Sequence, residues 1–302
     1  MKSVATIGTF DGVHRGHQAL IAKVVERAKL SGIQSAVVTF EPIPISVLRP
    51  ELYRGRLTTP EEKLRLLHQS GADHIEVVPF TMELAALEPE EFLKMLIEKI
   101  GMVELWIGDD FALGRNRSGS IEVIRDIGAE AGYSTNVYAR LPQGDSPISS
   151  TAIRKAIESG DVNAAATMLG RPFRVSGEVI HGAHLGRQIG YPTANFAPPG
   201  GMIQLADGIY ASTASVPGHF TDQQAMTYIG TRPTVDGVDR QVETNVLDFD
   251  GDLYGTWLTL DLIERVRPDQ TFDGLEPLIE QLSRDEVVIR GILARHVALK
   301  ID

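Results

Sequence analysis

The chain has 302 residues, of which 43% are hydrophobic and 23% charged, and this ordinary globular composition excludes wholesale disorder. Its formal net charge of -11 argues against a protein that coats nucleic acid by bulk attraction. Cysteine is absent, which excludes disulfides, thiolate metal sites and cysteine nucleophiles. At roughly 100–200 residues per domain, the length predicts two domains.

The sequence gives no sign of a membrane segment. The longest uncharged stretch, residues 188–206, contains three prolines and several polar residues, so it cannot form a spanning helix. The apolar run at the N-terminus is too short for a signal peptide. We therefore expect a cytoplasmic protein.

Residues 1–170 alternate the patterns of strands and helices. Short apolar runs predict strands over 3–7, 35–40, 75–78, 103–107 and 134–138. Helical spacing with capping signals predicts helices over 17–30, 60–70, 89–100, 121–131 and 150–159. These alternations favour an α/β fold with an open, doubly wound parallel sheet.

Residues 171–302 show a different pattern. Runs separated by Gly, Pro, Asp and Asn predict strands over 173–180, 209–216, 225–229, 242–249 and 258–263. Helices are predicted over 275–282 and 286–298. Many strands with a helical tail favour a small closed β-barrel, and we place the domain boundary near Gly170. Residues 171–302 are expected to fold alone.

The string from Gly8 to His17, Gly-Thr-Phe-Asp-Gly-Val-His-Arg-Gly-His, joins the first strand to the first helix. Its glycines allow a ligand to approach the backbone, and free amides at a helix start favour phosphate. His14 and His17 can donate hydrogen bonds to phosphate oxygens, and Gly16 leaves room between them. An isolated pair at this spacing is more often a surface pair, and a metal would need a third ligand. The position after the first strand of an α/β sheet instead favours nucleotide binding.

A second string, from Ile148 to Arg154, opens the last helix of this half. The hydroxyls of Ser149, Ser150 and Thr151, together with free amides, can hold phosphates. Arg154 can follow the charge that develops on a leaving pyrophosphate. The alternative is an N-cap serine followed by a solvated arginine.

Together the two strings resemble the nucleotidylyltransferase superfamily, and TIGTFDGVHRGHQAL resembles the FMN adenylyltransferase half of bacterial bifunctional riboflavin kinase/FAD synthetases. The resemblance includes residues 108–119. It implies that the FMN phosphate attacks the α-phosphorus of ATP and displaces pyrophosphate, with Mg²⁺ on the triphosphate. It assigns catalysis to His14, His17 and Arg154, ATP phosphates to Gly8, Phe10, Gly16, Ser149, Ser150 and Thr151, and the flavin to Asp110 and Asn116.

One position departs from the pattern of that family. After the second strand the family usually has Phe-x-Pro-His-Pro, whereas this chain has Phe-Glu-Pro-Ile-Pro, with Ile43 in place of histidine. An imidazole near the flavin phosphate or the triphosphate is therefore missing. Losing one hydrogen bond to a charged group costs roughly 1.5–3 kcal/mol, so we expect weaker adenylyl transfer.

The second half has no Walker A loop, because no Gly-Lys dipeptide occurs in the sequence. Phosphoryl transfer there would rely on backbone amides, a metal and arginine. A loop with Gly182, Gly186 and Gly190 can fold over phosphates, although glycines alone more often mark a turn between strands. Thr193 and Asn195 lie two residues apart in an extended segment, so both oxygens face one side and suit Mg²⁺ beside a triphosphate.

The string GRQIGYPTAN resembles the signature of riboflavin kinases, and the match continues in order through nearly all of residues 171–285. It implies a six-stranded β-barrel with a C-terminal helix, and transfer of phosphate from ATP to riboflavin. The resemblance assigns Mg²⁺ to Thr193 and Asn195, the general base on the riboflavin 5′-hydroxyl to Glu243, and the flavin side to Arg267 and Phe272.

Two positions depart from the kinase pattern. Tyr228 stands where asparagine is expected, and Asn245 stands where histidine is frequent. Neither departure removes a residue that the resemblance assigns to chemistry. Glu243 by itself could equally be an exposed carboxylate on a polar barrel face.

Three functions remain open at this point. The first is a bifunctional enzyme that converts riboflavin to FMN and FMN to FAD, with ATP, riboflavin and FMN as its partners. The second is a flavin-sensing regulatory protein with weak catalysis. The third is a riboflavin kinase whose adenylyltransferase half is impaired. The assigned side chains favour the enzyme, and the acidic charge argues against a nucleic-acid partner.

Overall fold

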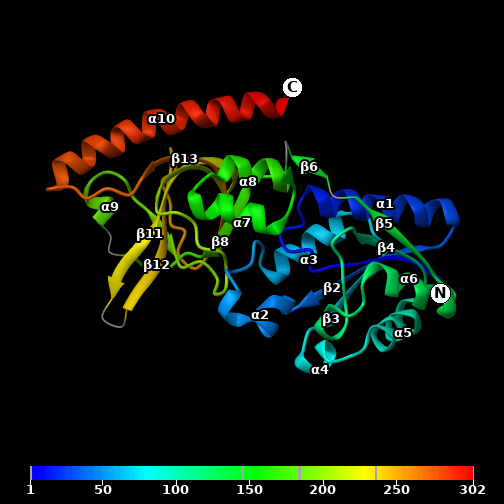
Figure 1. The fold of residues 1–302 in the computed structure, drawn as a ribbon. Helices are drawn as coiled ribbons and strands as arrows, with labels where there is room; N and C mark the ends of the chain where they lie inside the picture. Colours follow the sequence, from blue (N-terminus) through cyan, green and yellow to red (C-terminus); the bar gives the residue numbers. More distant parts are fainter. Residues whose placement is uncertain (1, 140, 144–145, 183–184, 235–236, 302) are drawn as a thin grey trace. The chain divides into compact units, whose positions relative to one another are not determined.

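A computed structural model describes residues 2–139, 141–143, 146–182, 185–234 and 237–301 (Figure 1). The chain forms two compact units, Met1–Ser150 and Thr151–Asp302. Each unit has its own sheet, and the two are described separately below.

The first unit is built on a five-stranded parallel sheet in the order β3-β2-β1-β4-β5. The strands are β1 Ser3–Ile7, β2 Gln34–Glu41, β3 His74–Pro79, β4 Met102–Gly108 and β5 Ser134–Tyr138. The chain runs outward from β1 to β3 and then returns to β4 on the other side of β1. The predicted doubly wound sheet is therefore confirmed, with its topological switch point between β1 and β4.

Helices cover both faces of this sheet. They are α1 Arg15–Ser31, α2 Pro44–Leu48, α3 Pro60–Gln69, α4 Met82–Ala85, α5 Pro89–Ile100 and α6 Ile121–Ala131, with short 3-10 turns η1 Pro50–Leu52 and η2 Arg115–Arg117. A hairpin of β6 Pro142–Gln143 and β7 Ser146–Pro147 precedes the end of the unit.

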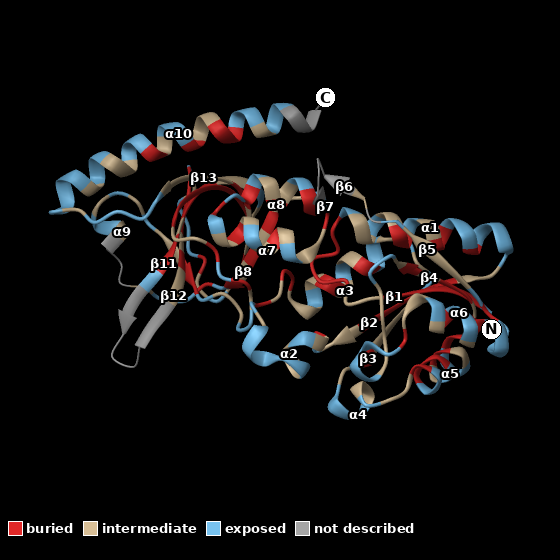
Figure 2. Ribbon diagram, in the orientation of Figure 1, coloured by how far each residue is buried: buried red, intermediate tan, exposed pale blue. Residues whose placement is uncertain are grey.

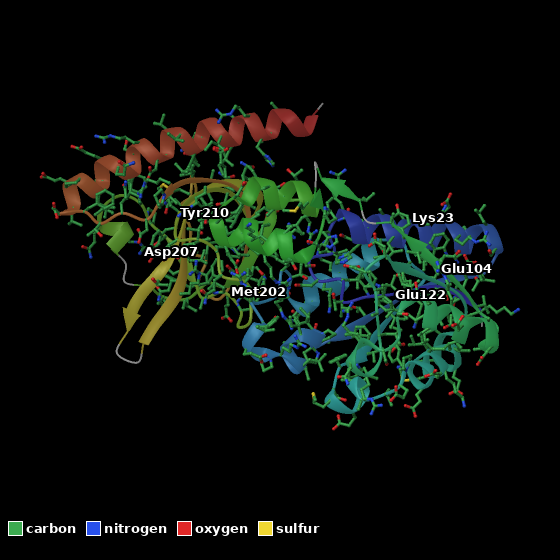
Figure 3. All side chains as sticks on the ribbon, in the orientation of Figure 1. Lys23, Glu104, Glu122, Met202, Asp207 and Tyr210 are labelled. Carbon is green, nitrogen blue, oxygen red and sulfur yellow. The ribbon has the colours of Figure 1, made fainter. Side chains whose placement is uncertain are left out.

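Alternation along the strands divides the core of this unit between the two faces. Ala36 and Val38 of β2 pack with Leu96 of α5, whereas Val37 between them packs with Ile21 of α1. Successive strand residues point to opposite faces, so the central strands β1 and β2 are buried on both sides by helices. A carboxylate at the edge of this core is paired: Glu104 of β4, labelled in Figure 3, accepts from Arg27 Nε at 3.0 Å and from Trp106 Nε1 at 2.8 Å.

The second unit is a six-stranded antiparallel sheet in the order β8-β13-β10-β11-β12-β9. The strands are β8 Phe173–Glu178, β9 Ala194–Phe196, β10 Gly208–Val216, β11 Phe220–Thr234, β12 Gly237–Val246 and β13 Trp257–Pro268. The sheet curls so that Ile180, just beyond β8, bridges Asn195 of β9, with the Ile180 amide donating to the Asn195 carbonyl at 2.8 Å. This bridge joins the two outer strands, and the predicted barrel is confirmed.

A long C-terminal helix, α10 Leu275–Ile301, lies along the barrel (Figure 1). Its buried positions Ile289, Ile292 and Leu293 pack on Ile209 and Met226 of the sheet. Figure 2 shows the result, with buried residues confined to parts of a mostly exposed helix. Two helices were predicted here, and one continuous helix is found.

Three more helices belong to the second unit or enter it. They are α7 Ser150–Ser159, which begins at the last residue of the first unit, α8 Val162–Leu169 and the short α9 Leu185–Gln188. The Ala206 amide donates to the Ile157 carbonyl at 3.4 Å, and the Arg265 side chain lies over Gly160. The structure thus groups residues 151–169 with the barrel, whereas the proposed boundary near Gly170 lies after them.

The contacts of α7 and α8 predict the stability of barrel fragments. A fragment of residues 171–302 lacks the buried Ile157, Met168 and Leu169. Each such side chain contributes about 1.5–3 kcal/mol when buried, so its midpoint of thermal unfolding should be about 10 °C or more below that of residues 151–302. Circular dichroism melts of the two fragments would measure this difference, and equal midpoints would contradict the role of the helices.

Candidate functional site

The loop between β1 and α1 has an unusual backbone. Phe10 (φ 47) and Val13 (φ 39) adopt left-handed conformations that non-glycine residues rarely take, and Gly12 (φ 79) lies between them. The buried Asp11 carboxylate fixes this turn by accepting from the Leu57 amide at 3.0 and 3.1 Å. Strain of this kind persists only where neighbours hold it in place, and it often marks a functional loop.

The two predicted histidines lie against each other at the start of α1. Their rings stack with centroids 3.5 Å apart, and Phe10 meets His17 edge-on at 5.1 Å. His14 is the N-cap residue, and its Nδ1 accepts from the His17 amide at 3.3 Å. An accepting Nδ1 in a neutral imidazole requires the ring proton to lie on Nε2 of His14.

The second histidine is held in its neutral form. Desolvation by packing lowers the pKa of His17 well below 6.5, and the neighbouring His14 lowers it further. At about pH 7 the ring is therefore an uncharged hydrogen-bonding group, and its Nδ1 is buried without a hydrogen-bond partner. A neutral imidazole can donate one hydrogen bond to a phosphate oxygen but supplies no positive charge.

The glycines of this loop lie close to aromatic rings. A Cβ on Gly8 would lie 3.0 Å from Phe10 Cζ, and a Cβ on Gly16 would lie 3.2 Å from the His14 ring. The start of α7 meets the same loop, because Ser150 Oγ donates to the Asp11 carbonyl at 3.1 Å. The structure therefore brings the first string together with the beginning of the second.

The other residues of the second string differ in their exposure. Ser149 is half-buried beside Ser150, at the end of the first unit. Thr151 is exposed in the first turn of α7, and Arg154 is half-buried one turn further along, both in the second unit.

The loop after β4 lies at the other side of the switch point. Asp110 and Asn116, the predicted flavin residues of this unit, are both exposed there. Arg117 Nη2 donates to the Asp110 carbonyl at 3.0 Å, and Leu113 bridges Gly119 to close the loop. Parallel α/β sheets bind ligands at such carboxyl edges, where the β1 and β4 loops flank the switch point.

Ile43 lies next to a cluster of charges at the end of β2. Its side chain is 4% exposed and its residue is the N-cap of α2, so the position is part of the packed structure. Glu41 nearby pairs with Arg56 at 2.6 Å and with the buried Lys63 at 3.0 Å, and these bonds lower the pKa of the Glu41 carboxyl despite its burial. Weaker adenylyl transfer because of Ile43 stays a prediction.

His17 should make stability depend on pH. Because its pKa is lowered on folding, the unfolded chain binds more protons below about pH 6.5, and stability falls as the pH falls through that value. Above about pH 6.5 both states are neutral and the effect disappears. His17→Gln removes the titrating group, so its unfolding free energy should fall less on acidification, by at most about 1.4 kcal/mol per pH unit. Denaturant unfolding between about pH 5 and about pH 8 measures this, and identical slopes would contradict it.

In the barrel, strand register brings the predicted kinase residues into one row. Asn195 of β9 is paired with Glu243 of β12, and Glu243 is paired with Tyr228 of β11. Tyr228 is paired with Ile209 of β10, which is paired in turn with Arg267 of β13. Directly paired residues present their side chains on the same face, and neighbouring strands lie about 4.8 Å apart. The row therefore runs about 19 Å across the face that α10 also covers.

One end of this row carries the predicted metal ligands. Asn195 Nδ2 donates to the Thr193 carbonyl at 3.0 Å and to Thr193 Oγ1 at 3.2 Å, an arrangement that leaves Asn195 Oδ1 as the oxygen for a cation. A Cβ on Gly182 would lie 2.7 Å from the Asn195 amide, so glycine is required beside it. Two neutral oxygens fit Mg²⁺ when phosphate oxygens and water complete its shell.

The rest of the glycine loop forms a tight turn. The Tyr191 amide donates to the Gly186 carbonyl at 2.8 Å, and a Cβ on Gly186 would overlap the Tyr191 carbonyl oxygen. Gly190 (φ 85) is left-handed and exposed. Among the residues that the structure describes, no three His, Cys, Asp or Glu side chains gather as a metal site.

The other end of the row is fixed by a buried ion pair. Arg267 binds Asp285 of α10 through two nitrogens, with Nε–Oδ2 at 2.9 Å and Nη2–Oδ2 at 2.8 Å, and both side chains are largely buried. The Phe272 ring lies beneath the same guanidinium, and Arg267 Cζ is 5.8 Å from the centroid of that ring. Arg267 is thus anchored to α10 as well as being placed on the predicted flavin side.

Sequence reasoning missed two residues that shape this site. Asn245, two residues after Glu243 and on the same face, donates to the Pro192 carbonyl at 2.7 Å and so holds the strand against the metal-ligand segment. Asp285 was missed because a charged residue between two predicted helices reads as a solvated break. Its partner Arg267 lies 18 residues earlier, in a strand that also carries Asp261, Glu264 and Arg265, so no local signal singled out the pair.

Comparisons with known proteins identify the family of the chain. The model of the FAD synthetase family matches residues 1–152, and the model of the riboflavin kinase family matches residues 169–293. The chain is 37% identical to the bifunctional riboflavin kinase/FMN adenylyltransferase of Escherichia coli strain K12, over 95% of this chain and 91% of that protein. The chain belongs to the bifunctional riboflavin kinase/FMN adenylyltransferase family. The Bacillus subtilis member is 34% identical over 94% of this chain and 90% of its own length.

A solved structure is also similar over nearly the whole chain. It is titled a macrolide-efflux protein from Streptococcus pneumoniae, and it matches with a TM-score of 0.87 and 30% identity over 96% of this chain and 94% of that one. In the part of this chain that the structure describes, no helix combines the length and apolar character needed to cross a membrane.

Proposed function

We infer that this protein makes FAD from riboflavin in two ATP-dependent steps, phosphorylation of riboflavin to FMN and adenylylation of FMN with release of pyrophosphate. The observation that carries the kinase step is the single row in which Asn195, Glu243 and Arg267 share one face of the barrel. Membership of the family and the paired histidines of the first unit support the second step.

In the kinase step, Glu243 is the general base. Its carboxylate orients the 5′-hydroxyl of riboflavin and accepts its proton as the oxygen attacks the γ-phosphorus of ATP, whose bond to the bridging oxygen breaks so that ADP leaves. Thr193 and Asn195 would hold Mg²⁺, which supplies charge neutralisation for the triphosphate. The backbone of the loop with Gly182, Gly186 and Gly190 would cover the phosphates, since this half has no Gly-Lys motif.

In the adenylylation step, the residues position and stabilise charge. The start of α1, with Gly8, Phe10 and Gly16, receives the ATP phosphates, and Ser149, Ser150 and Thr151 add hydroxyl and amide donors. His14 and the neutral His17 donate hydrogen bonds to phosphate oxygens. Because the neutral His17 supplies no full charge, Arg154 stabilises the leaving pyrophosphate. Asp110 and Asn116, exposed after β4, contact the flavin.

We further propose that the partners are small molecules only and that the reactions take place in the cytoplasm. The use of ATP in both steps supports this location. The net charge of -11 supports the absence of a nucleic-acid partner.

Product analysis tests this function directly. Purified protein with riboflavin, Mg²⁺ and ATP is expected to give FMN followed by FAD, separated by chromatography. FMN without FAD would mean that the first unit is impaired. Neither product, with flavin still bound, would mean a flavin-sensing protein and would overturn the proposal.

Two single substitutions should separate the two activities. Glu243→Gln keeps the size of the side chain and its hydrogen bond but cannot readily accept a proton, so FMN formation should fall by about 10²–10⁴-fold. Riboflavin binding and FAD formation from supplied FMN should change little. His14→Ala should do the reverse, with FAD formation lost and riboflavin phosphorylation retained.

Each variant serves as the control for the other. The activity that a variant keeps shows that its chain is folded. Initial rates of both steps would be measured for both proteins. If Glu243→Gln keeps near-normal kinase turnover, proton removal belongs to solvent or to the phosphate. If His14→Ala lowers both rates equally, the histidine has a folding role.

A further inference from the structure

Tyr228 occupies the middle of the barrel row, between Glu243 and Ile209. Its ring lies over Gly230, two residues further along the same face, because a Cβ on Gly230 would overlap the phenol. Its hydroxyl donates to Asp269 Oδ2 at 3.1 Å. A large side chain thus fills the space between the reacting end of the row and its Arg267 end.

Asp269 belongs to the short segment that follows β13 and also carries Phe272, and Arg267 lies in the last residues of β13 just before it. The Arg267–Asp285 ion pair ties this end of β13 to α10. The Tyr228–Asp269 hydrogen bond ties it to β11, beside Glu243. The segment is therefore held from two sides, by elements distant in sequence.

The tyrosine remains a hydrogen-bond donor over the physiological range. Burial, followed by the charges of Asp269, Asp207 and Glu243, raises the pKa of Tyr228 to about 12. At about pH 7 the hydroxyl is therefore protonated. An ionised carboxylate can only accept a hydrogen bond, so the hydroxyl is the donor to Asp269.

We propose that Tyr228 is a positioning residue for riboflavin, whose bond to Asp269 holds the segment from Arg267 to Phe272 in place as one wall of the flavin subsite. The inference rests on the proposed kinase function and concerns only how its substrate is held. With the bond intact, the wall is formed before riboflavin arrives. Without it, binding must also order the segment, which weakens affinity but leaves Glu243 and the metal ligands unchanged.

The test uses the full chain and the variant Tyr228→Phe, which removes only the hydroxyl. We expect the KM and Kd of riboflavin to rise about 3- to 10-fold, as for one partly exposed hydrogen bond to a charged group, with kcat and the KM of ATP changed by less than about twofold. Asp269→Ala should do the same. Because the two residues share one bond, the double variant should be no weaker than either single variant.

Tyr210→Phe is the matched control. Tyr210 is the next residue after Ile209, so it points into the barrel, where its hydroxyl donates to the Ala206 carbonyl at 2.6 Å (Figure 3). Its loss should lower the midpoint of thermal unfolding and leave the KM of riboflavin unchanged.

Two results would overturn the proposal. One is an unchanged Kd of riboflavin in Tyr228→Phe. The other is an equal loss of kcat and of affinity for both substrates together with a lower unfolding midpoint, which is the pattern of a merely structural bond. A failure of the kinase function itself is distinguishable, because the unaltered protein would then form no FMN.

Discussion

The second unit depends on the register of its antiparallel strands. A slip of one residue would turn Glu243 from the face it shares with Asn195 to the barrel interior. Hydroxyls inside the barrel oppose such a slip: Thr227 Oγ1 lies 2.7 Å from Ser212 Oγ and 3.0 Å from Thr244 Oγ1. These buried groups can pair only in one register, so a polar ladder inside the barrel fixes the chemistry on its outer face.

The first unit fixes the positions of its functional side chains by a different means. Parallel strands place their carboxyl ends at one edge, and the functional groups lie in the loops rather than on the strands. A loop needs other constraints, and here Asp11 supplies them by binding Leu57 while Ser150 binds the Asp11 carbonyl. One buried carboxylate and its backbone therefore hold together segments about 140 residues apart in sequence.

Much of this could be predicted from the sequence, for identifiable reasons. The five parallel strands follow from apolar runs, and α3 begins at Pro60 because the hydroxyl of the N-cap residue Thr59 accepts from the Glu62 amide. The string around His14 marked its site correctly as a strand–helix junction. Local signals of this kind are contained within a few residues.

The features that were missed depend on distant partners. The single row of the barrel could not be read from the sequence, because register relates residues as far apart as Asn195 and Arg267. The continuity of α10 was missed because Ser283-Arg284-Asp285 looks like a polar break. Asp285 is instead buried, where Arg267 and the Gln281 amide, at 2.8 Å, both donate hydrogen bonds to its carboxylate.

That ion pair also constrains how this sequence can change over evolution. A buried carboxylate left without its guanidinium is strongly destabilising, whereas replacing both partners by well-packed apolar residues can be nearly neutral. Lysine cannot substitute for Arg267, since it has no planar fork to match both oxygens of Asp285. Among diverging descendants of this chain, the two positions should therefore change together or not at all, and they would form a covarying pair linking the last strand to the last helix.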